Sequence, residues 1–230
     1  MSQSAPNIAA VIPAYQAAPS VGDVVRRSLA QLSRVVVVDD GSTDGTGDAA
    51  RDAGATEVLV HEHNRGKGAG LRTAMTHLFA DGVDYVATLD ADGQHLPEEL
   101  PKLLAMIDQD PGLVLGVRSQ LFAEMGRVRR TSNKVSSHLI SLVAGQTFSD
   151  IQTGFRLYHR DLFEAVGMRE DGFDAESAVV VRACRKGLRI LTTPIELGFV
   201  DGRCTSHYRP LHDSVRIARA VIGARLEGKR

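Results

Sequence analysis

Short runs of β-branched residues alternate with longer amphipathic stretches along the first half of the chain. The runs predict strands at 8–13, 34–40, 57–60, 84–90 and 113–118. Between them, apolar residues recur at helical spacing over 19–32, 44–54, 66–82 and 97–109. Asp44 and Pro97 suit helix starts, while Gly54 and Gly82 suit helix stops. This alternation is typical of βαβ units, so it predicts an α/β fold with a mostly parallel, Rossmann-like sheet flanked by helices.

The pattern changes after residue 118, where it predicts a smaller antiparallel and helical extension. Helices are expected over 131–144, 174–187 and 210–228, and strands over 154–159, 189–195 and 196–200. The last helix carries an apolar stripe and several arginines elsewhere on its surface; the stripe consists of Val215, Ala218, Ile222 and Leu226. Such a helix can lie on an anionic bilayer or pack its stripe onto the sheet. The sequence leaves both arrangements open.

Composition narrows the class of protein. The 230 residues are 43% hydrophobic, which is enough for one compact domain over residues 1–230. The net charge of −1 gives no reason to expect a nucleic-acid partner. Cys184 and Cys204 form no CxxC pair, which favours a reducing compartment. No basic, apolar leader opens the chain and no apolar run approaches the ~20 residues of a membrane span. We therefore expect a cytoplasmic protein with, at most, peripheral contact at the membrane face.

The stretch LDADGQH ends a predicted strand with several polar groups side by side. In extended chain, alternate residues share a face, so Asp90, Asp92 and Gln94 are expected to converge. Two carboxylates and an amide oxygen are hard ligands that suit Mg²⁺ or Mn²⁺, with positions left for phosphate oxygens. The alternative is an acidic turn that caps a helix beginning at Pro97. The DxD pattern by itself does not decide between them.

Two further segments carry candidate ligand-binding groups. Asp39 and Asp40 end the second predicted strand, where a carboxylate can accept hydrogen bonds from a base N–H or from ribose hydroxyls. Arg65 and Lys67 lie among glycines at a predicted helix N-terminus, which suits phosphate. The spacing is not that of a Walker A motif. These segments predict a nucleotide site at the carboxyl ends of the strands.

Taken in order, the motifs resemble those of family 2 glycosyltransferases of the GT-A fold. The matching stretches are VIPAY (11–15), VVVVDDGSTDGT (35–46), NRGKGAGLRTA (64–74), LDADGQH (89–95), TGFRLY (153–158) and SHYRPLHDSVRI (206–217). The similarity is greatest to polyprenyl-phosphate hexosyltransferases, the group that includes dolichyl-phosphate mannose synthase. It implies a nucleotide-diphosphate sugar donor, a divalent cation and inversion at the anomeric carbon. It also implies a donor-binding half over about 7–118 and an acceptor-side half over about 119–217.

The resemblance assigns roles by position. It places the nucleoside against Pro13, Tyr15, Asp39 and Asp40, the donor beside Arg65 and Lys67, and the metal on Asp90, Asp92 and Gln94. For the acceptor phosphate it points to Arg118, Arg130 and Asn133, with Arg127 and Arg129 competing for the role of Arg130.

Two positions depart from the family pattern. The usual Asn-Glu after the first-motif tyrosine is Gln16-Ala17 here, which puts base or sugar preference in question. His207 replaces a common lysine, so a phosphate contact there would be weaker and pH-dependent. Arg203, as a donor-side group, and Arg209 can compensate for that change.

The acceptor decides which residues carry the chemistry. A polyprenyl phosphate is already ionised, so its transfer reaction needs positioning and charge neutralisation more than a protein base. A hydroxyl acceptor requires a base, for which Asp150, Asp174 and Glu176 are candidates. The sequence predicts a metal-dependent hexosyltransferase that uses a polyprenyl phosphate. A hydroxyl-acceptor enzyme and a non-catalytic nucleotide-sugar-binding module are the alternatives.

Overall fold

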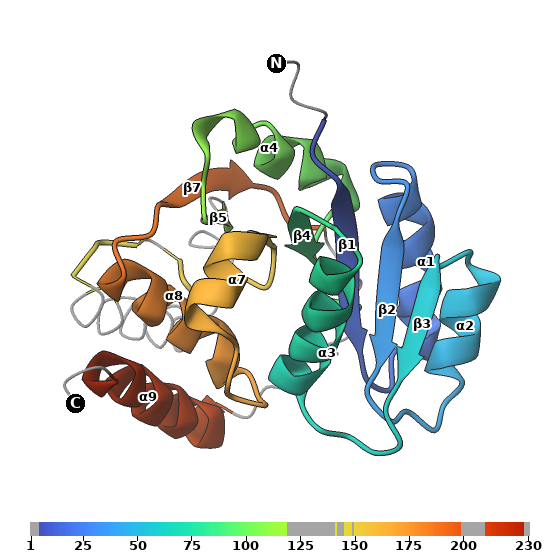
Figure 1. The fold of residues 1–230 in the computed structure, drawn as a ribbon. Coiled ribbons are helices and arrows are strands. Elements are labelled where there is room, and N and C mark those ends of the chain that lie inside the picture. The colour runs from blue at the N-terminus through green and yellow to red at the C-terminus, as the bar shows by residue number, and fades with distance from the viewer. Residues whose placement is uncertain (1–4, 119–140, 142–144, 149, 199–209, 228–230) are drawn as a thin grey trace.

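The computed structural model describes residues 5–118, 141, 145–148, 150–198 and 210–227, with side chains of the last segment described from residue 216. Its centre is a seven-stranded sheet of order β3-β2-β1-β4-β6-β5-β7 (Figure 1). The strands are β1 (Ile8–Ala14), β2 (Val35–Asp39), β3 (Glu57–Val60), β4 (Tyr85–Thr88), β5 (Leu113–Arg118), β6 (Arg156–His159) and β7 (Ile190–Ile195).

Helices flank both faces of this sheet. They are α1 (Ala18–Leu29), α2 (Thr46–Asp52), α3 (Lys67–Ala80), α4 (Leu100–Leu104), α7 (Arg160–Val166), α8 (Asp174–Arg185) and α9 (Pro210–Leu226), with 3₁₀ turns η1 (Pro97–Glu99) and η2 (Ile107–Gln109). In the part of the chain that the structure describes, no helix combines the length and the apolar character that crossing a membrane requires.

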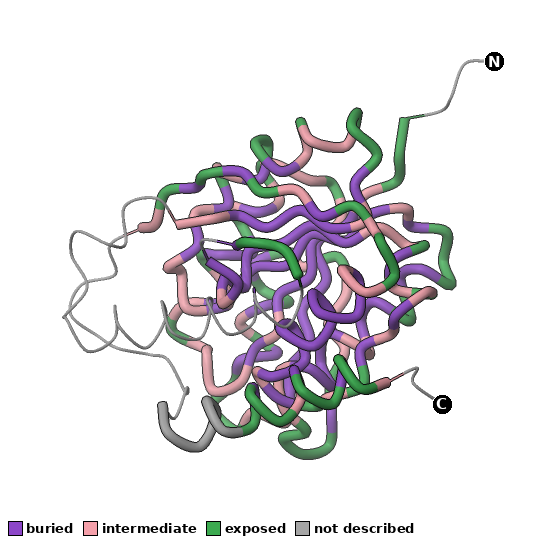
Figure 2. Tube along the Cα trace, turned by 90° about the vertical axis from the view of Figure 1, so that its left-hand side faces the viewer, coloured by how far each residue is buried: buried purple, intermediate pink, exposed green. Residues whose placement is uncertain are grey.

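The strand alternation explains how both faces are covered. Val36 and Val38 of β2 belong to the core cluster that includes α3, whereas Val35 and Val37 belong to the cluster that includes α1. All four valines are fully buried, as expected for a strand between two helical layers. Figure 2 shows these buried strands through the middle of the molecule. A continuous valine run is therefore the sequence signature of this central strand.

The connectivity creates a switch point beside β1. From β1 the chain passes to β2 and β3 on one side and then returns to β4 on the other. These pairs are parallel, and so is the β5–β7 pair. β6 lies between β4 and β5 and is antiparallel to both. The mostly parallel sheet is thus confirmed. In open α/β sheets, ligands bind at the carboxyl ends of the strands at such a switch point.

Several predicted elements differ from the structure. The fourth strand ends at Thr88 instead of 90, and the helix over 97–109 is divided into η1, α4 and η2. Pro101 explains the break between η1 and α4, because it lacks an N–H and favours a helix start. The described part of the predicted strand 196–200 forms only an isolated bridge between His95 and Leu197. Helix α7 was not predicted. Within the predicted helix 131–144, Ser141 is the one residue that the structure describes, and the description resumes at Gly145.

The carboxyl-terminal helix packs on α8, but not through the predicted stripe. Ile217, Val221 and Ala224 are buried there, whereas Ala218, Ile222 and Leu226 are exposed. The arrangement in which the predicted stripe packs onto the sheet is therefore wrong. The contact with α8 is made by Ile217, Val221 and Ala224, which lie on a neighbouring face of the helix.

Helices α3 and α8 approach so closely that one glycine has no room for a side chain. A Cβ at Gly68 would lie 2.4 Å from the Glu170 carbonyl oxygen and 2.6 Å from the Ala175 Cβ. At Gly70, two residues along the same helix, the nearest atom would be a Val38 methyl carbon at an ordinary 3.5 Å.

We expect Gly68→Ala to destabilise the protein by roughly 1–3 kcal/mol, because α3 and α8 must move apart. Gly70→Ala is the matched control, and it should be neutral or stabilising by up to about 1 kcal/mol through helix propensity. Urea unfolding of the two variants measures the difference. Equal stabilities would show that the close α3–α8 contact does not constrain the fold.

Candidate active site

Two acidic segments meet at the carboxyl edge of the sheet, on either side of β1. Asp39 ends β2, and Asp90 follows β4. Both strands pair with β1, so the two segments are separated by two strand spacings, roughly 10 Å. A nucleoside diphosphate is long enough to bridge that span. The predicted nucleotide and metal residues therefore belong to one edge of the fold.

The DxD segment is a turn and not an extended strand. It turns at Ala91–Gly93, and Gly93 adopts a φ of 75°. The Asp92 Oδ1 atom accepts a hydrogen bond from the Gln94 N–H at 3.0 Å, while the Gln94 carbonyl accepts one from the Gly198 N–H. The extended-chain reason for convergence of Asp90, Asp92 and Gln94 is thus wrong. Asp90 and Asp92 still lie together, whereas a ligand role for the Gln94 side chain stays a prediction.

Lys67 connects the half-buried carboxylate of Asp90 with the buried carboxylate of Glu176 at the centre of the site. Its Nζ lies 2.6 Å from Asp90 Oδ1 and 2.9 Å from Glu176 Oε2. Burial alone would lower the pKa of Lys67, but the two carboxylates outweigh burial and raise it. Burial would likewise raise the pKa of Asp90, yet the charge of Lys67 lowers it to about 2. The ammonium is therefore the counter-ion that keeps these acids ionised.

Among the described residues, no cationic side chain forms an ion pair with Asp92. Burial, and then the negative charge of Asp90, raise the pKa of Asp92. A nearby cation would stabilise this pair, because it offsets the repulsion between the two carboxylates. His95 adds no charge, because burial lowers its pKa, and its Nδ1 accepts a hydrogen bond from the Asp90 N–H at 3.3 Å. The pair of Asp90 and Asp92 thus has the chemistry of a hard divalent-cation site.

The described residues contain no group of three or more His, Cys, Asp or Glu side chains that converge as a complete metal site. Two carboxylates are nevertheless suited to Mg²⁺ or Mn²⁺, which often take one or two protein carboxylates together with substrate phosphate oxygens. The residues present therefore fit a cation that is bound together with a diphosphate.

The segment that leads into β6 packs against the Asp90–Lys67 ion pair. A Cβ at Gly154 would lie 2.6 Å from Asp90 Oδ2 and 2.7 Å from Lys67 Nζ, so only glycine fits there. Arg156 is fully buried and donates to the carbonyl oxygens of Ile151, Thr153 and Glu176 at 2.6–2.8 Å. One guanidinium thus joins the turn before β6 to the start of α8.

The candidate bases all have cationic partners. Asp150 receives a bidentate pair of hydrogen bonds from Arg118, at 2.6 and 2.9 Å. Asp174 lies 3.2 Å from Arg216, and Glu176 pairs with Lys67. Each candidate base is therefore already engaged in an ion pair. Arg118, predicted at the acceptor phosphate, uses two of its five N–H groups on Asp150.

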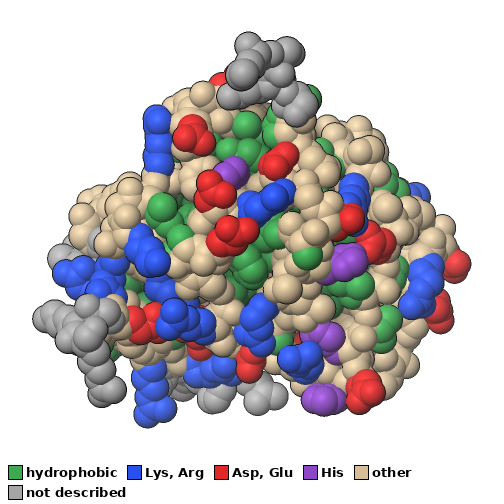
Figure 3. All heavy atoms as spheres, viewed as in Figure 1, with side chains coloured by type: hydrophobic (Ala, Val, Ile, Leu, Met, Phe, Trp, Pro, Cys, Tyr) green, Lys and Arg blue, Asp and Glu red, His purple; other side chains and the backbone are tan. Residues whose placement is uncertain are grey.

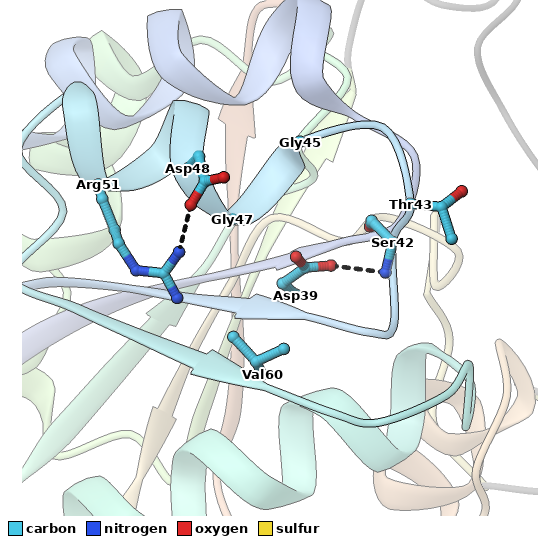
Figure 4. Close-up of a pocket in the computed structure, with 8 residues that line it drawn as sticks. All are labelled: Asp39, Ser42, Thr43, Gly45, Gly47, Asp48, Arg51 and Val60. Atoms are coloured by element: carbon cyan, nitrogen blue, oxygen red, sulfur yellow. Dashed lines mark hydrogen bonds and ion pairs between the residues drawn. The ribbon is translucent and has the colours of Figure 1, made fainter.

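A small pocket opens beside Asp39 on the α2 face of the sheet (Figure 4). It encloses about 240 Å³ and is lined by Asp39, Ser42, Thr43, Gly45, Gly47, Asp48, Arg51 and Val60. Asp39 Oδ1 accepts from the Ser42 N–H at 2.9 Å, and Arg51 pairs with Asp48 at the rim. The volume is below the 300–1,000 Å³ typical of small-molecule sites, so it suits part of a ligand.

Asp40, next to Asp39, contacts the loop that leads into α3. Its Oδ1 accepts from the Arg65 N–H at 3.0 Å and contacts His61 Nδ1 at 2.7 Å, and its Oδ2 accepts from the Gly66 N–H at 2.7 Å. Both oxygens are thus engaged in holding the loop that leads into α3. Asp40 thus supports the loop that carries Lys67, while a nucleoside contact by Asp40 stays a prediction; the Arg65 side chain is exposed.

The first-motif residues lie at the end of β1 between the two acidic segments. Pro13 and Tyr15 are half-buried there. Gln16, which departs from the family pattern, adopts a φ of 51° and joins the next turn through hydrogen bonds with Ser42 and Thr43. Gln16 therefore shapes the β1–α1 turn. The predicted Arg130, Asn133, Arg203, His207 and Arg209 lie outside the described residues.

Three residues next to the site are not among the predicted site residues. His95 lies in LDADGQH, Arg156 lies in TGFR, and His61 directly follows β3. A histidine or arginine inside an apolar strand context was the available signal, because such side chains are buried only when they are paired. Their partners are distant in sequence, so the pairing itself could not be read there.

The sequence of this chain is similar to those of known glycosyltransferases. Residues 9–167, more than half of the chain, match the model of "Glycosyl transferase family 2". Glycosyltransferase AglJ of Haloferax volcanii is 32% identical over 189 residues, which cover 79% of this chain and 60% of that protein. Undecaprenyl-phosphate mannosyltransferase of Micrococcus luteus is 35% identical over 174 residues, which cover 71% of each chain. The chain therefore spans less than two thirds of the first relative and somewhat more of the second.

Among solved structures, glucosyl-3-phosphoglycerate synthase from Mycobacterium tuberculosis, in complex with Mn²⁺, uridine diphosphate and glucosyl-3-phosphoglycerate, has the same fold. The TM-score is 0.74 at 18% identity, covering 95% of this chain and 80% of that chain. At this identity the likeness establishes the GT-A architecture alone.

We expect Lys67→Met to destabilise the fold by roughly 3 kcal/mol, because Asp90 and Glu176 lose their shared counter-ion. The control is Lys102→Met, whose exposed ammonium pairs with Glu99 and should contribute under about 1 kcal/mol. Chemical denaturation near neutral pH measures both. Similar losses in the two variants would contradict a central role for the Lys67 bridge.

Proposed function

The chain belongs to glycosyl transferase family 2, and we propose that it transfers a hexose from a nucleoside-diphosphate sugar to a polyprenyl phosphate with a divalent cation. The observation that carries the proposal is the bridge from Asp90 through Lys67 to Glu176, with Asp92 beside it, at the switch point of the sheet. The relative named as an undecaprenyl-phosphate mannosyltransferase supports the acceptor class.

The donor fits across the end of β1. In the proposal the base enters the Asp39 pocket, where the carboxylate can accept a base N–H, and Pro13 and Tyr15 flank the nucleoside. The diphosphate then reaches Asp90 and Asp92, which hold the cation. A cation held by Asp90 and Asp92 would supply positive charge to the diphosphate leaving group, which these acids would otherwise repel. The exposed Arg65 side chain is available to the donor phosphates from the loop before α3.

The ion pairs at the candidate bases favour a phosphate acceptor. Asp150, Asp174 and Glu176 each already contact a cationic side chain, whereas a hydroxyl acceptor would need one of them to take its proton. An acceptor phosphate oxygen needs no deprotonation before it attacks the anomeric carbon. As the new carbon–oxygen bond forms, the bond to the donor diphosphate breaks and the nucleoside diphosphate leaves with that electron pair.

Arg118 is the described residue best suited to the acceptor side. It lies near enough to Asp90 to help lower the pKa of that carboxyl, and the N–H groups not bound to Asp150 can bind phosphate. Arg130 and Asn133 stay predictions for the same phosphate. The proposal places the reaction in the cytoplasm, at the membrane face that carries the lipid.

The acceptor class is tested by supplying labelled nucleotide sugars and Mg²⁺ or Mn²⁺ with a short-chain polyprenyl phosphate or with its dephosphorylated alcohol. We expect a glycolipid product only with the phosphate. Product from the alcohol would support the hydroxyl-acceptor enzyme, and donor binding without product from either lipid would support a binding module.

The metal site is tested with Asp92→Ala, for which we expect a loss of transfer of at least roughly a hundredfold, because a charge contact to the leaving group is lost. Asp108→Ala removes an exposed acid of η2 and should keep full activity. Mn²⁺ binding in the presence of nucleoside diphosphate gives a second readout. Undiminished transfer by the Asp92 variant would refute the metal assignment.

The two adjacent aspartates should separate binding from stability. Asp39→Asn is expected to weaken nucleotide binding roughly tenfold or more, because a base N–H loses a charged acceptor. Asp40→Asn is expected to lower the free energy of unfolding by roughly 1–3 kcal/mol, because three contacts to one loop are disturbed. Calorimetric titration with nucleoside diphosphates and thermal melts measure the two effects. A reversed outcome would exchange the roles.

A further inference from the structure

Helix α9 has two apolar faces, and the residues that the structure describes cover only one of them. Ile217, Val221 and Ala224 are buried in the same core cluster as Ala178 and Val181 of α8. On the other side, Ile222 and Leu226 are 55% and 59% exposed. Figure 2 shows α9 along the lower edge, with exposed positions facing away from the body.

Ala218, Ile222 and Leu226 form the outer face of α9. They are spaced four residues apart, so they lie in one stripe along the helix. Among the described residues, the remaining exposed large hydrophobic side chain is Val60 of β3, at 56%. Two of the three such side chains therefore lie one turn apart on a single helix. A fold that buries nearly all its apolar side chains leaves this stripe uncovered.

Arginines flank the outer face on both sides. At about 100° per residue, Arg225 and Arg219 fall on opposite borders of the stripe, and both are exposed. The sequence holds no acidic residue between Asp213 and Glu227, and Glu227 pairs with Arg182 of α8. Figure 3 shows basic side chains along this lower part of the molecule. The outer face is therefore apolar at its centre and cationic at its borders.

The helix that carries this face is firmly attached. Arg182 donates to both Glu227 and Glu170, and Arg185 donates to the Ala224 carbonyl oxygen at 2.6 Å. Near the other end, Arg216 lies 3.2 Å from Asp174, two residues before Glu176 in the site. The face is thus presented by a docked helix whose inner contacts reach the acidic centre.

We propose that the outer face of α9 docks on an anionic lipid bilayer. Its apolar stripe would enter the headgroup boundary while Arg219 and Arg225 contact lipid phosphates, as in interfacial amphipathic helices. A second copy is disfavoured as the occupant, because a twofold contact through this stripe would bring the arginines of both copies together. In Figure 1 the arrowheads of β2 and β3 point toward the edge along which α9 lies.

The biological meaning of this surface rests on the proposed function. A bilayer under α9 would lie on the side of the molecule where the parallel strands end. A polyprenyl phosphate is held in such a bilayer by its hydrocarbon chain, so docking would bring its phosphate to the edge that holds Asp90 and Lys67. In this proposal, the outer face of α9 determines the side from which the lipid acceptor reaches the site.

The test is flotation of the full chain with vesicles of phosphatidylcholine alone or with phosphatidylglycerol added. We expect binding to the anionic vesicles that falls as salt is raised. The paired variants Ile222→Ser/Leu226→Ser and Arg219→Gln/Arg225→Gln should each weaken binding roughly tenfold or more. The matched controls are Val60→Ser for exposed apolar area and Lys102→Gln for exposed charge. In the flotation assay, both should bind vesicles as the unchanged chain does. Thermal melts verify that every variant folds.

Transfer assays separate this inference from the proposed function. With a water-soluble short-chain polyprenyl phosphate and no vesicles, both α9 variants should keep full transfer, whereas with long-chain acceptor in anionic vesicles they should lose roughly tenfold. Vesicle binding that the α9 variants do not reduce would overturn the docking proposal, as would dimerisation through the stripe without vesicle binding. Absence of transfer to the short-chain acceptor would instead overturn the proposed reaction and leave the vesicle result standing.

Discussion

The site depends on one ammonium group between acidic side chains. Asp90, Asp92 and Glu176 are brought to a small, largely buried volume, where like charges repel strongly and water does little to screen them. Lys67 resolves that repulsion by contacting Asp90 and Glu176 at once. Its position is fixed in turn by the loop that Asp40 holds and by the close approach of α3 to α8. The packing of α3 against α8 therefore also determines where the charge of Lys67 lies in the site.

A second consequence concerns how ligand charge is accommodated. Lys67 satisfies Asp90 and Glu176 but leaves Asp92 beside another carboxylate, so the centre retains a net need for positive charge. A divalent cation that arrives with a diphosphate meets that need and brings its own negative partner. Lys67 therefore balances two of the three acids, and the third supplies the charge that attracts a cation.

The sequence predicted the strands of the sheet, most helices and the carboxyl edge where ligands bind, because these follow from local periodicity and from the rule for parallel sheets. It could not predict that Asp90–Gln94 forms a turn, since extended and turn backbones share the same polar residues. It also could not distinguish Asp39 from Asp40. Which of two adjacent carboxylates meets the loop of residues 65–66 depends on contacts between segments about 25 residues apart, and periodicity carries no such information.

The antiparallel strand β6 has a consequence for how the molecule is built. The four strands from β3 to β4 can pair within the first 88 residues, but β5 pairs only with β6 and β7. A growing chain that has not yet produced β6 therefore holds β4 with one open edge and β5 with no partner. The same late strand delivers Gly154 and Arg156 to the acidic centre. Completion of the sheet and assembly of the acidic centre therefore both wait for the same segment of the chain.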